Sequence, residues 1–232
     1  MVRPILHSAG LTTMKEDLRK RLGDLVGSDK VLASDAELLC YSYDATPLVS
    51  GRPDAVVRVF SEEDIQRTLE FAASEGLPVT TRGSGTGLSG GSVPVQGGIV
   101  ILTTGMNRIL EIDTDDLSVE VEPGVITADL HAAVEAKGLF FPPDPGSMKV
   151  STIGGNVAEN AGGLRGLKYG ITGDYVLSLD TYLIDGSKVR YGTRCVKDVA
   201  GYNLTKFLVG SEGTIGIFSK IALKLIPKPR TK

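Results

Sequence analysis

Residues 82–91 are Arg-Gly-Ser-Gly-Thr-Gly-Leu-Ser-Gly-Gly, so five of these ten positions are glycine. Because glycine has no Cβ, the main-chain N–H groups of such a loop can turn inward and approach an anion closely. Ser84, Thr86 and Ser89 add hydroxyl donors, and Arg82 could add a positive charge. The chemistry that this segment favours is phosphate binding.

Three known nucleotide-binding motifs can be compared with this loop. A Walker A loop needs a lysine directly after its last glycine, and no glycine in the chain is followed by lysine. Residues 85–90 match the G-x-G-x-x-G pattern of dinucleotide-binding folds, but that motif must open a helix, whereas residues 91–98 hold Pro94 and three glycines. The H-R-D and D-F-G sequences of protein kinases are absent. The loop is therefore expected to hold phosphate through its own amides, without a helix behind it.

A second group of glycine segments lies further along the chain. It consists of Pro-Pro-Asp-Pro-Gly-Ser at 142–147, Thr-Ile-Gly-Gly-Asn at 152–156 and Asn-Ala-Gly-Gly at 160–163. Ser151 or Thr152 can cap a short helix, and Gly154 and Gly155 in its first turn would leave N–H donors open to a flat or anionic group. Each glycine costs about 1 kcal/mol in a helix relative to alanine, so a ligand is expected to compensate.

Two asparagines and a third glycine segment complete the candidate site. Asn156 and Asn160 are one helical turn apart and are expected to face one ligand. The third segment, Gly-Ser-Glu-Gly-Thr-Ile-Gly-Ile at 210–217, joins a predicted short helix to a strand. Taken alone, it is equally well explained as a tight turn between the two.

Composition excludes several classes of protein. With 25 basic and 28 acidic residues, the net charge of −3 argues against a nucleic-acid-binding protein. No apolar run approaches the ~20 residues that span a bilayer, and residues 1–10 do not have the apolar run of a signal peptide, so the cytoplasm is the expected location. Cys40 and Cys195 are too few and too far apart for a disulfide framework or a metal site, and they are predicted to be buried.

The rest of the sequence predicts an α+β fold with two lobes. Residues 1–53 form a helical segment and connector, residues 54–105 a β-α-β lobe, and residues 106–232 a lobe richer in strands. Strands are predicted at 55–60, 77–81, 98–103, 108–113, 118–122, 176–184, 187–191 and 214–226. Helices are expected after Ser34 and Ser61 and over 127–137. Asp185-Gly186 predicts a hairpin turn.

Taken together, the glycine segments resemble the FAD-binding domain of the flavin oxidases typified by vanillyl-alcohol oxidase and p-cresol methylhydroxylase. The branch that the chain resembles most is the glycolate oxidase flavin subunit and the FAD-linked D-lactate dehydrogenases. The phrase Tyr-Ser-Tyr-Asp-Ala at 41–45 is also similar to that branch. The resemblance implies the two-lobed fold of p-cresol methylhydroxylase (PCMH), with FAD extended between an N-terminal β-α-β lobe and a second β-rich lobe.

The same resemblance implies which residues contact FAD. Around the pyrophosphate they are Arg82, Gly83, Ser84, Gly85, Thr86, Gly87, Leu88 and Ser89. Along the ribityl chain and the flavin they are Pro143, Asp144, Thr152, Gly154, Gly155, Asn156, Asn160, Ala161 and Gly162. Main-chain groups of Glu212, Gly216 and Ile217 border the cofactor.

Some relatives bind FAD covalently through a histidine in the glycine loop. The histidines of this chain are His7 and His131, and neither lies in that loop. Non-covalent FAD is therefore expected. His131 is expected to be a packing or surface residue.

The activity implied is oxidation of a 2-hydroxy acid such as glycolate or D-lactate. Family members usually continue with a substrate-capping domain, which carries most substrate-binding groups, so the chain is expected to be a fragment without assignable catalytic residues. One alternative is a non-catalytic FAD-binding or electron-transfer subunit completed by a partner chain, such as an iron–sulfur subunit that could also associate with a membrane. A nicotinamide-binding Rossmann dehydrogenase is a third, weaker alternative.

Overall fold

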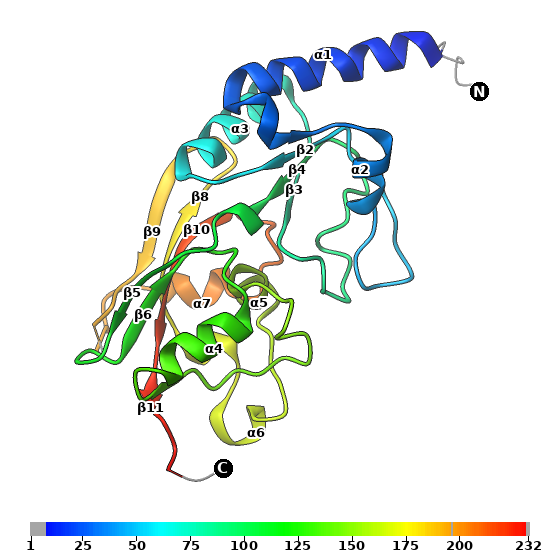
Figure 1. Ribbon diagram of the computed structural model, residues 1–232. Helices are drawn as coiled ribbons and strands as arrows, with labels where there is room; N and C mark the ends of the chain where they lie inside the picture. Colours follow the sequence, from blue (N-terminus) through cyan, green and yellow to red (C-terminus); the bar gives the residue numbers. More distant parts are fainter. Residues whose placement is uncertain (1–7, 196, 231–232) are drawn as a thin grey trace.

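The structure is a computed structural model that describes residues 8–195 and 197–230. Figure 1 shows two lobes, with helix α1 lying across the end of the first lobe and the C-terminal residues at the far end of the second. The N-terminal segment consists of α1 (Ser8–Val26), the 3-10 turn η1 (Ser28–Lys30), strand β1 (Val31–Leu32) and helix α2 (Asp35–Cys40). Helix α2 begins at the predicted Ser34, whose hydroxyl accepts a hydrogen bond from Glu37 N–H while the Glu37 carboxylate accepts one from Ser34 N–H. Strand β1 was not predicted.

The first lobe holds a four-stranded sheet in the order β1-β2-β4-β3. Its other elements are β2 (Ala55–Arg58), α3 (Glu62–Glu75), β3 (Val79–Arg82), β4 (Ile99–Leu102) and the 3-10 turn η2 (Thr103–Gly105). Ser61 caps α3 and Gly76 ends it, as predicted. The predicted β-α-β unit is present, but β2 and β3 are not neighbours, because β4 lies between them and is parallel to both.

Both faces of this first sheet are buried. Alternate residues of a strand point to opposite faces. Val57, Ile99 and Ile101 pack with residues of α1 and α3, whereas Val56 and Val100 pack with Leu38 of α2. This two-sided burial explains the nearly continuous run of β-branched residues in β2 and β4. It also fixes the end of β3, from which the glycine loop starts.

The second lobe is built on a five-stranded antiparallel sheet in the order β5-β6-β10-β8-β9. Its strands are β5 (Ile109–Asp113), β6 (Ser118–Val121), β8 (Val176–Tyr182), β9 (Lys188–Gly192) and β10 (Ile217–Lys224), and a small pair joins β7 (Leu139–Phe140) to β11 (Ile226–Pro227). Its helices are α4 (Thr127–Glu135), α5 (Ile153–Glu159), α6 (Gly166–Tyr169) and α7 (Leu204–Leu208), with the 3-10 turn η3 (Thr172–Asp174). The hairpin predicted around Asp185-Gly186 joins β8 to β9.

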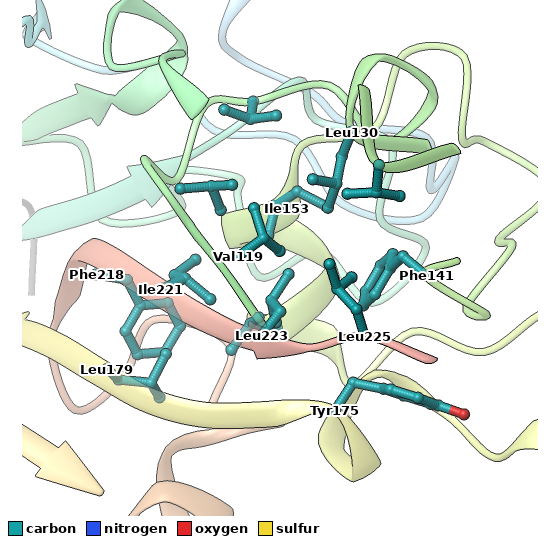
Figure 2. Close-up of a cluster of buried hydrophobic side chains, with 14 of the residues drawn as sticks. Val119, Leu130, Phe141, Ile153, Tyr175, Leu179, Phe218, Ile221, Leu223 and Leu225 are labelled. Atoms are coloured by element: carbon teal, nitrogen blue, oxygen red, sulfur yellow. The ribbon is translucent and has the colours of Figure 1, made fainter. Parts of the chain in front are cut away.

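The core of the second lobe lies between this sheet and helices α4 and α5, as Figure 2 shows. Phe141 is fully buried, and its ring lies 5.9 Å from that of Tyr175 in an edge-on arrangement. Ile153, the first residue of α5, belongs to the same cluster. The core therefore holds the N-terminal turn of α5 in place.

The lobes are in direct contact. Glu62, at the start of α3, accepts hydrogen bonds from Lys188 Nζ at 2.9 Å and from Ser219 Oγ at 3.1 Å. Tyr182 and Ile217, from the second sheet, pack into the hydrophobic cluster of the first lobe. These contacts fix the two sheets relative to each other, which confirms the predicted two-lobed α+β fold.

Two other expectations concern the thiols and the membrane. Cys40 and Cys195 are exposed, so the prediction that they are buried was wrong. Cys40 ends a short helix, and Cys195 lies beyond the end of β9, outside either sheet. Among the described residues, no helix has both the length and the apolar character needed to cross a bilayer.

Candidate cofactor-binding site

A cavity of about 250 Å³ lies where the ends of both sheets meet. Three segments distant in sequence form most of its wall, namely the loop after β3, the first turns of α5 and the turn before β10. Thr103 of η2, Pro123, which follows β6, and Ser147 also line the cavity. The three glycine segments singled out in the sequence therefore meet at one cavity.

The loop after β3, which lines this cavity, carries main-chain donors without a protein acceptor among the described residues. Within the described chain, none of the nine N–H groups from Gly83 to Gly91 donates a hydrogen bond to another protein atom. The loop is held by other groups, since Ser84 Oγ donates to Val150 O and Gly87 O accepts from Ala45 N at 3.2 Å. A run of open N–H groups in a fixed loop is an anion-binding arrangement, and no helix follows it before β4.

Arg82 supports this loop from behind and does not line the cavity. Its side chain is only 6% exposed, Nη1 donates to Ser92 O at 3.2 Å, and the guanidinium lies 5.6 Å from the centre of the Tyr41 ring. Burial lowers the pKa of the guanidinium, whereas the nearby carboxylate of Asp44 raises it. Gly85 has a φ of +70°, and a Cβ there would overlap the Arg82 guanidinium. The arginine therefore shapes the loop.

The Tyr-Ser-Tyr-Asp-Ala segment at 41–45 contacts the glycine loop and its flanking residues. Tyr41 stacks on the Arg82 guanidinium, Asp44 Oδ2 accepts a hydrogen bond from Ser92 Oγ at 3.4 Å, and Ala45 binds the loop as described above. None of the residues 41–45 lines the cavity.

The first turn of α5 differs from the expectation. Thr152 caps the helix by accepting from Gly155 N at 3.2 Å, and Gly154 N donates to Pro123 O at 2.8 Å. The prediction that these amides are open donors was therefore wrong. The glycines serve close packing: a Cβ at Gly154 would lie 2.7 Å from Pro123 Cβ, and one at Gly83 would overlap Thr152 Oγ1.

The side chains of the two asparagines, which were predicted to face one ligand, lie against different protein partners. Asn156 lines the cavity, but its Nδ2 donates to Thr127 Oγ1 at 2.7 Å. Asn160 ends α5 in a left-handed conformation, with a φ of +50°, and its Oδ1 accepts from Gly173 N at 2.8 Å. The helix therefore ends at Asn160, and its side chain turns toward η3.

Thirteen of the twenty residues predicted to contact the cofactor line the cavity. They are Gly83, Ser84, Gly85, Thr86, Gly87, Leu88, Thr152, Gly154, Gly155, Asn156, Ala161, Glu212 and Gly216. The other seven lie outside its wall, and they are Arg82, Ser89, Pro143, Asp144, Asn160, Gly162 and Ile217. The role of each residue in binding stays a prediction.

Pro143 and Asp144 are used within the protein. His131 Nε2 lies 2.9 Å from Pro143 O, the acceptor of that hydrogen bond, and Asp144 Oδ1 accepts from Arg165 N at 3.0 Å. His131 also packs on Phe141, with the two ring centres 5.9 Å apart. His131 is not among the cavity residues.

Glu159 is a charged cavity residue that the sequence interpretation missed. It is the last residue of α5, and the Ser89 hydroxyl lies 3.1 and 3.2 Å from its two carboxylate oxygens. The available signal was helical spacing, since Glu159 is one turn after Gly155 and two turns after Thr152, both in a flagged segment. Thr103 and Pro123 were missed because they carry no motif.

Sequence comparison decides the family. The profile of the FAD binding domain family matches residues 53–192, which is more than half of the chain. The chain belongs to this family. The resemblance derived from the glycine segments is thereby confirmed, and FAD is the cofactor.

The chain is similar to two curated proteins whose names describe oxidoreductases. It is 52% identical over 217 residues to "Glycolate oxidase subunit GlcD" of Bacillus subtilis (strain 168), covering 94% of this chain and 46% of the relative. It is 43% identical over 194 residues to "D-lactate dehydrogenase" of Archaeoglobus fulgidus, covering 82% of this chain and 43% of the relative. The chain thus spans less than half the length of these relatives.

Solved structures support the same fold. Residues of the whole FAD-binding chain superpose on p-cresol methylhydroxylase with a TM-score of 0.82 at 22% identity, covering 100% of this chain and 46% of that one. An alkyldihydroxyacetonephosphate synthase gives a TM-score of 0.80 at 22% identity over 93% of this chain and 44% of that one. The fold of this FAD-binding chain is therefore the PCMH type.

Proposed function

We propose that this chain is the FAD-binding part of an oxidoreductase that oxidises a 2-hydroxy acid of the glycolate or D-lactate type. The observation that carries the proposal is the loop from Gly83 to Gly91, whose nine N–H groups have no protein acceptor among the described residues and seven of whose residues line a cavity between the lobes. Such donors suit the diphosphate of FAD. The names of the relatives supply the substrate class, since they are a glycolate oxidase subunit and D-lactate dehydrogenases.

In this proposal the chain binds and orients the cofactor. The glycine loop holds the diphosphate, and residues of α5 together with the 212–216 turn line the rest of the cofactor. When bound, the flavin supplies the redox chemistry by accepting a hydride from the hydroxyl-bearing carbon of the substrate. The contacts of Arg82 and Thr152 keep the cradle formed before the cofactor arrives, which lowers the ordering cost of binding.

Groups for the substrate carboxylate are proposed to come from polypeptide outside these residues. Among the described cavity residues there is no lysine, arginine or histidine that could pair with a carboxylate. The apolar side chains of Leu164, Leu167 and Tyr202 are more than nine-tenths exposed, as expected for surfaces that a further domain covers. We therefore propose that the chain corresponds to part of a longer enzyme, and that its own activity is weak.

The function is tested by anaerobic flavin reduction. The FAD-loaded chain and the longest polypeptide encoded by the same gene are mixed with glycolate, D-lactate or D-2-hydroxyglutarate, and loss of the visible flavin absorbance is followed. At least one acid should reduce the flavin of the longer polypeptide. The flavin of the 232-residue chain should be reduced at least about a hundredfold more slowly, because the groups that position the substrate would be missing. Succinate, which has no hydroxyl group, is the control.

The opposite result would favour a different role. If dithionite reduces the bound flavin of the longer polypeptide but no 2-hydroxy acid does, the chain is better explained as an FAD-binding or electron-transfer subunit that a partner completes. The apolar surface around Leu164 and Tyr202 would then be a subunit contact.

We also propose that FAD is bound without a covalent link. Among the described residues, no histidine, cysteine or tyrosine lines the cavity. These are the side chains that would form a covalent bond to the flavin. Acid denaturation followed by filtration should release all of the yellow colour into the filtrate. Colour retained on the precipitated protein would contradict a non-covalent complex.

A further inference from the structure

Carboxylates occupy part of the wall where the diphosphate of FAD is expected. Glu159 and Glu212 are the only charged residues among those that line the cavity in the described chain. Asp44 lies behind the glycine loop, and its charge also acts on Glu159. A dianionic diphosphate would therefore enter a site that already carries negative charge.

Glu159 and Glu212 both lie against the loop that carries the open amides, and Glu212 Oε2 is 2.9 Å from the position that a Cβ on Gly91 would take. The contact of Glu159 is with Gly87 and Ser89. Glu159 Oε1 is 2.9 Å from the position that a Cβ on Gly87 would take, so the carboxylate lies against the glycine loop. Its hydrogen-bond partner is the Ser89 hydroxyl, from the same loop. Within the described residues, Glu159 takes part in no ion pair, and neither do Glu212 or Asp44.

The surroundings of Glu159 favour its neutral form. Burial raises the pKa of its carboxyl group, the Ser89 hydrogen bond lowers it, and the carboxylates of Glu212 and Asp44 raise it further. These are the charged and titratable groups that face it: Glu212 from the turn before β10, and Asp44 from the segment after α2. A phosphate placed beside it would act in the same direction as these two carboxylates.

We propose that Glu159 binds FAD as a neutral carboxylic acid, its O–H donating a hydrogen bond to a phosphate oxygen, so that FAD binding takes up one proton. The proton comes from solvent and stays on the carboxyl group while the cofactor is bound. A protonated carboxyl group is a donor, whereas an ionised one only accepts. This inference rests on the proposed position of the diphosphate at the glycine loop.

The sign of the pH dependence follows from linkage. Where Glu159 is ionised in the free chain and protonated in the complex, raising the pH removes a reactant, so the dissociation constant for FAD increases. For one proton, the limiting increase is tenfold for each pH unit. At pH values low enough to protonate Glu159 in the free chain, the dissociation constant becomes independent of pH.

The experiment is an FAD titration of the apo chain between about pH 5.5 and 8.5, followed by flavin fluorescence. The dissociation constant of the wild type should rise with pH, by up to about tenfold per unit. Glu159→Gln keeps the shape of the side chain, and its amide N–H can donate a hydrogen bond without taking up a proton from solvent. This variant should therefore bind FAD with little pH dependence, and more tightly than the wild type at pH 8.5. Calorimetry in two buffers of different ionisation enthalpy should count close to one proton taken up by the wild type and none by Glu159→Gln.

Two further variants assign the proton. Glu212→Gln keeps Glu159 and should retain the pH dependence, and Glu70→Gln, an exposed glutamate on α3, should match the wild type. Burial lowers the pKa of the His131 imidazole, and any contribution of this group to the pH dependence would persist in Glu159→Gln. A pH dependence that disappears in Glu212→Gln and persists in Glu159→Gln would overturn the assignment.

Other outcomes also overturn the proposal. Glu159→Gln binding FAD at least tenfold more weakly at every pH, with an unchanged slope, would mean that Glu159 accepts a hydrogen bond from the cofactor as a carboxylate. Tight binding that needs Mg²⁺ would mean that a cation, not a proton, separates the charges. If the wild type binds no FAD at any pH, the proposed function fails; if FAD binds with a constant affinity across the range, only this inference fails.

Discussion

Valine in place of Gly85 is expected to weaken FAD binding by roughly 10- to 100-fold. The φ of +70° at this position is one that a β-branched residue adopts only at a cost of about 1–3 kcal/mol, and each 1.4 kcal/mol corresponds to a factor of ten. A Cβ would also overlap the buried guanidinium of Arg82, which has Ser92 and Tyr41 as its own partners. In the free chain the loop would therefore adopt other conformations. The apparent affinity for FAD falls in proportion to the fraction of molecules whose loop keeps the binding conformation.

The measurement for Gly85→Val is a titration of the apo chain with FAD, with circular dichroism to confirm that the variant is folded. Gly166→Val is the matched control, because a Cβ there meets nothing within 4 Å and no residue of α6 lines the cavity. The control should bind FAD as the wild type does. Affinity of Gly85→Val within twofold of the wild type would show that this loop conformation is not needed for binding.

Alanine in place of Phe141 should cause the largest loss of stability, about 3–5 kcal/mol of unfolding free energy. Phe141 is fully buried in the core shown in Figure 2, and its ring contacts those of Tyr175 and His131. Truncation leaves a cavity between rigid elements that cannot close over it. For a chain of this size the melting temperature should fall by roughly 6–20 °C.

Phe207→Ala is the matched control for that experiment. Phe207 lies on α7 with 68% of its surface exposed, so the same truncation should change the unfolding free energy by about 0.5 kcal/mol or less. Both melting curves are recorded with and without saturating FAD. Since Phe141 does not line the cavity, FAD should raise the melting temperature of the variant as it does that of the wild type. A fall of less than about 3 °C for Phe141→Ala would contradict the packing described here.

The parts of this fold that follow local rules could be predicted from the sequence. Ser61 and Gly76 define the ends of α3, because a side-chain cap and a helix-ending glycine act within one turn. Asp185-Gly186 defines the β8–β9 hairpin in the same way. The position of β4 between β2 and β3 could not be predicted, since strand order depends on pairing between residues far apart in the chain.

The site shows the same division. The glycine content of residues 83–91 predicted a loop with open amides, and these amides have no protein acceptor in the part of the chain that the structure describes. This feature is local, because it depends on the loop sequence itself. The amides of Gly154 and Gly155 were predicted to be open, and it was not foreseeable that Pro123, about thirty residues earlier, accepts from one of them. Glu159 was missed for a related reason: its contact with Ser89 depends on how α5 and the loop meet across the two lobes.

The measurement that tests the central claim most directly is amide hydrogen exchange of the 83–91 segment, with and without FAD. These N–H groups have no protein acceptor, so they should exchange rapidly in the free chain. FAD should slow their exchange by at least about tenfold, while the already bonded amides of Gly154 and Asn156 change much less. Saturation with FAD that leaves exchange at 83–91 unchanged would contradict the assignment of the diphosphate to this loop.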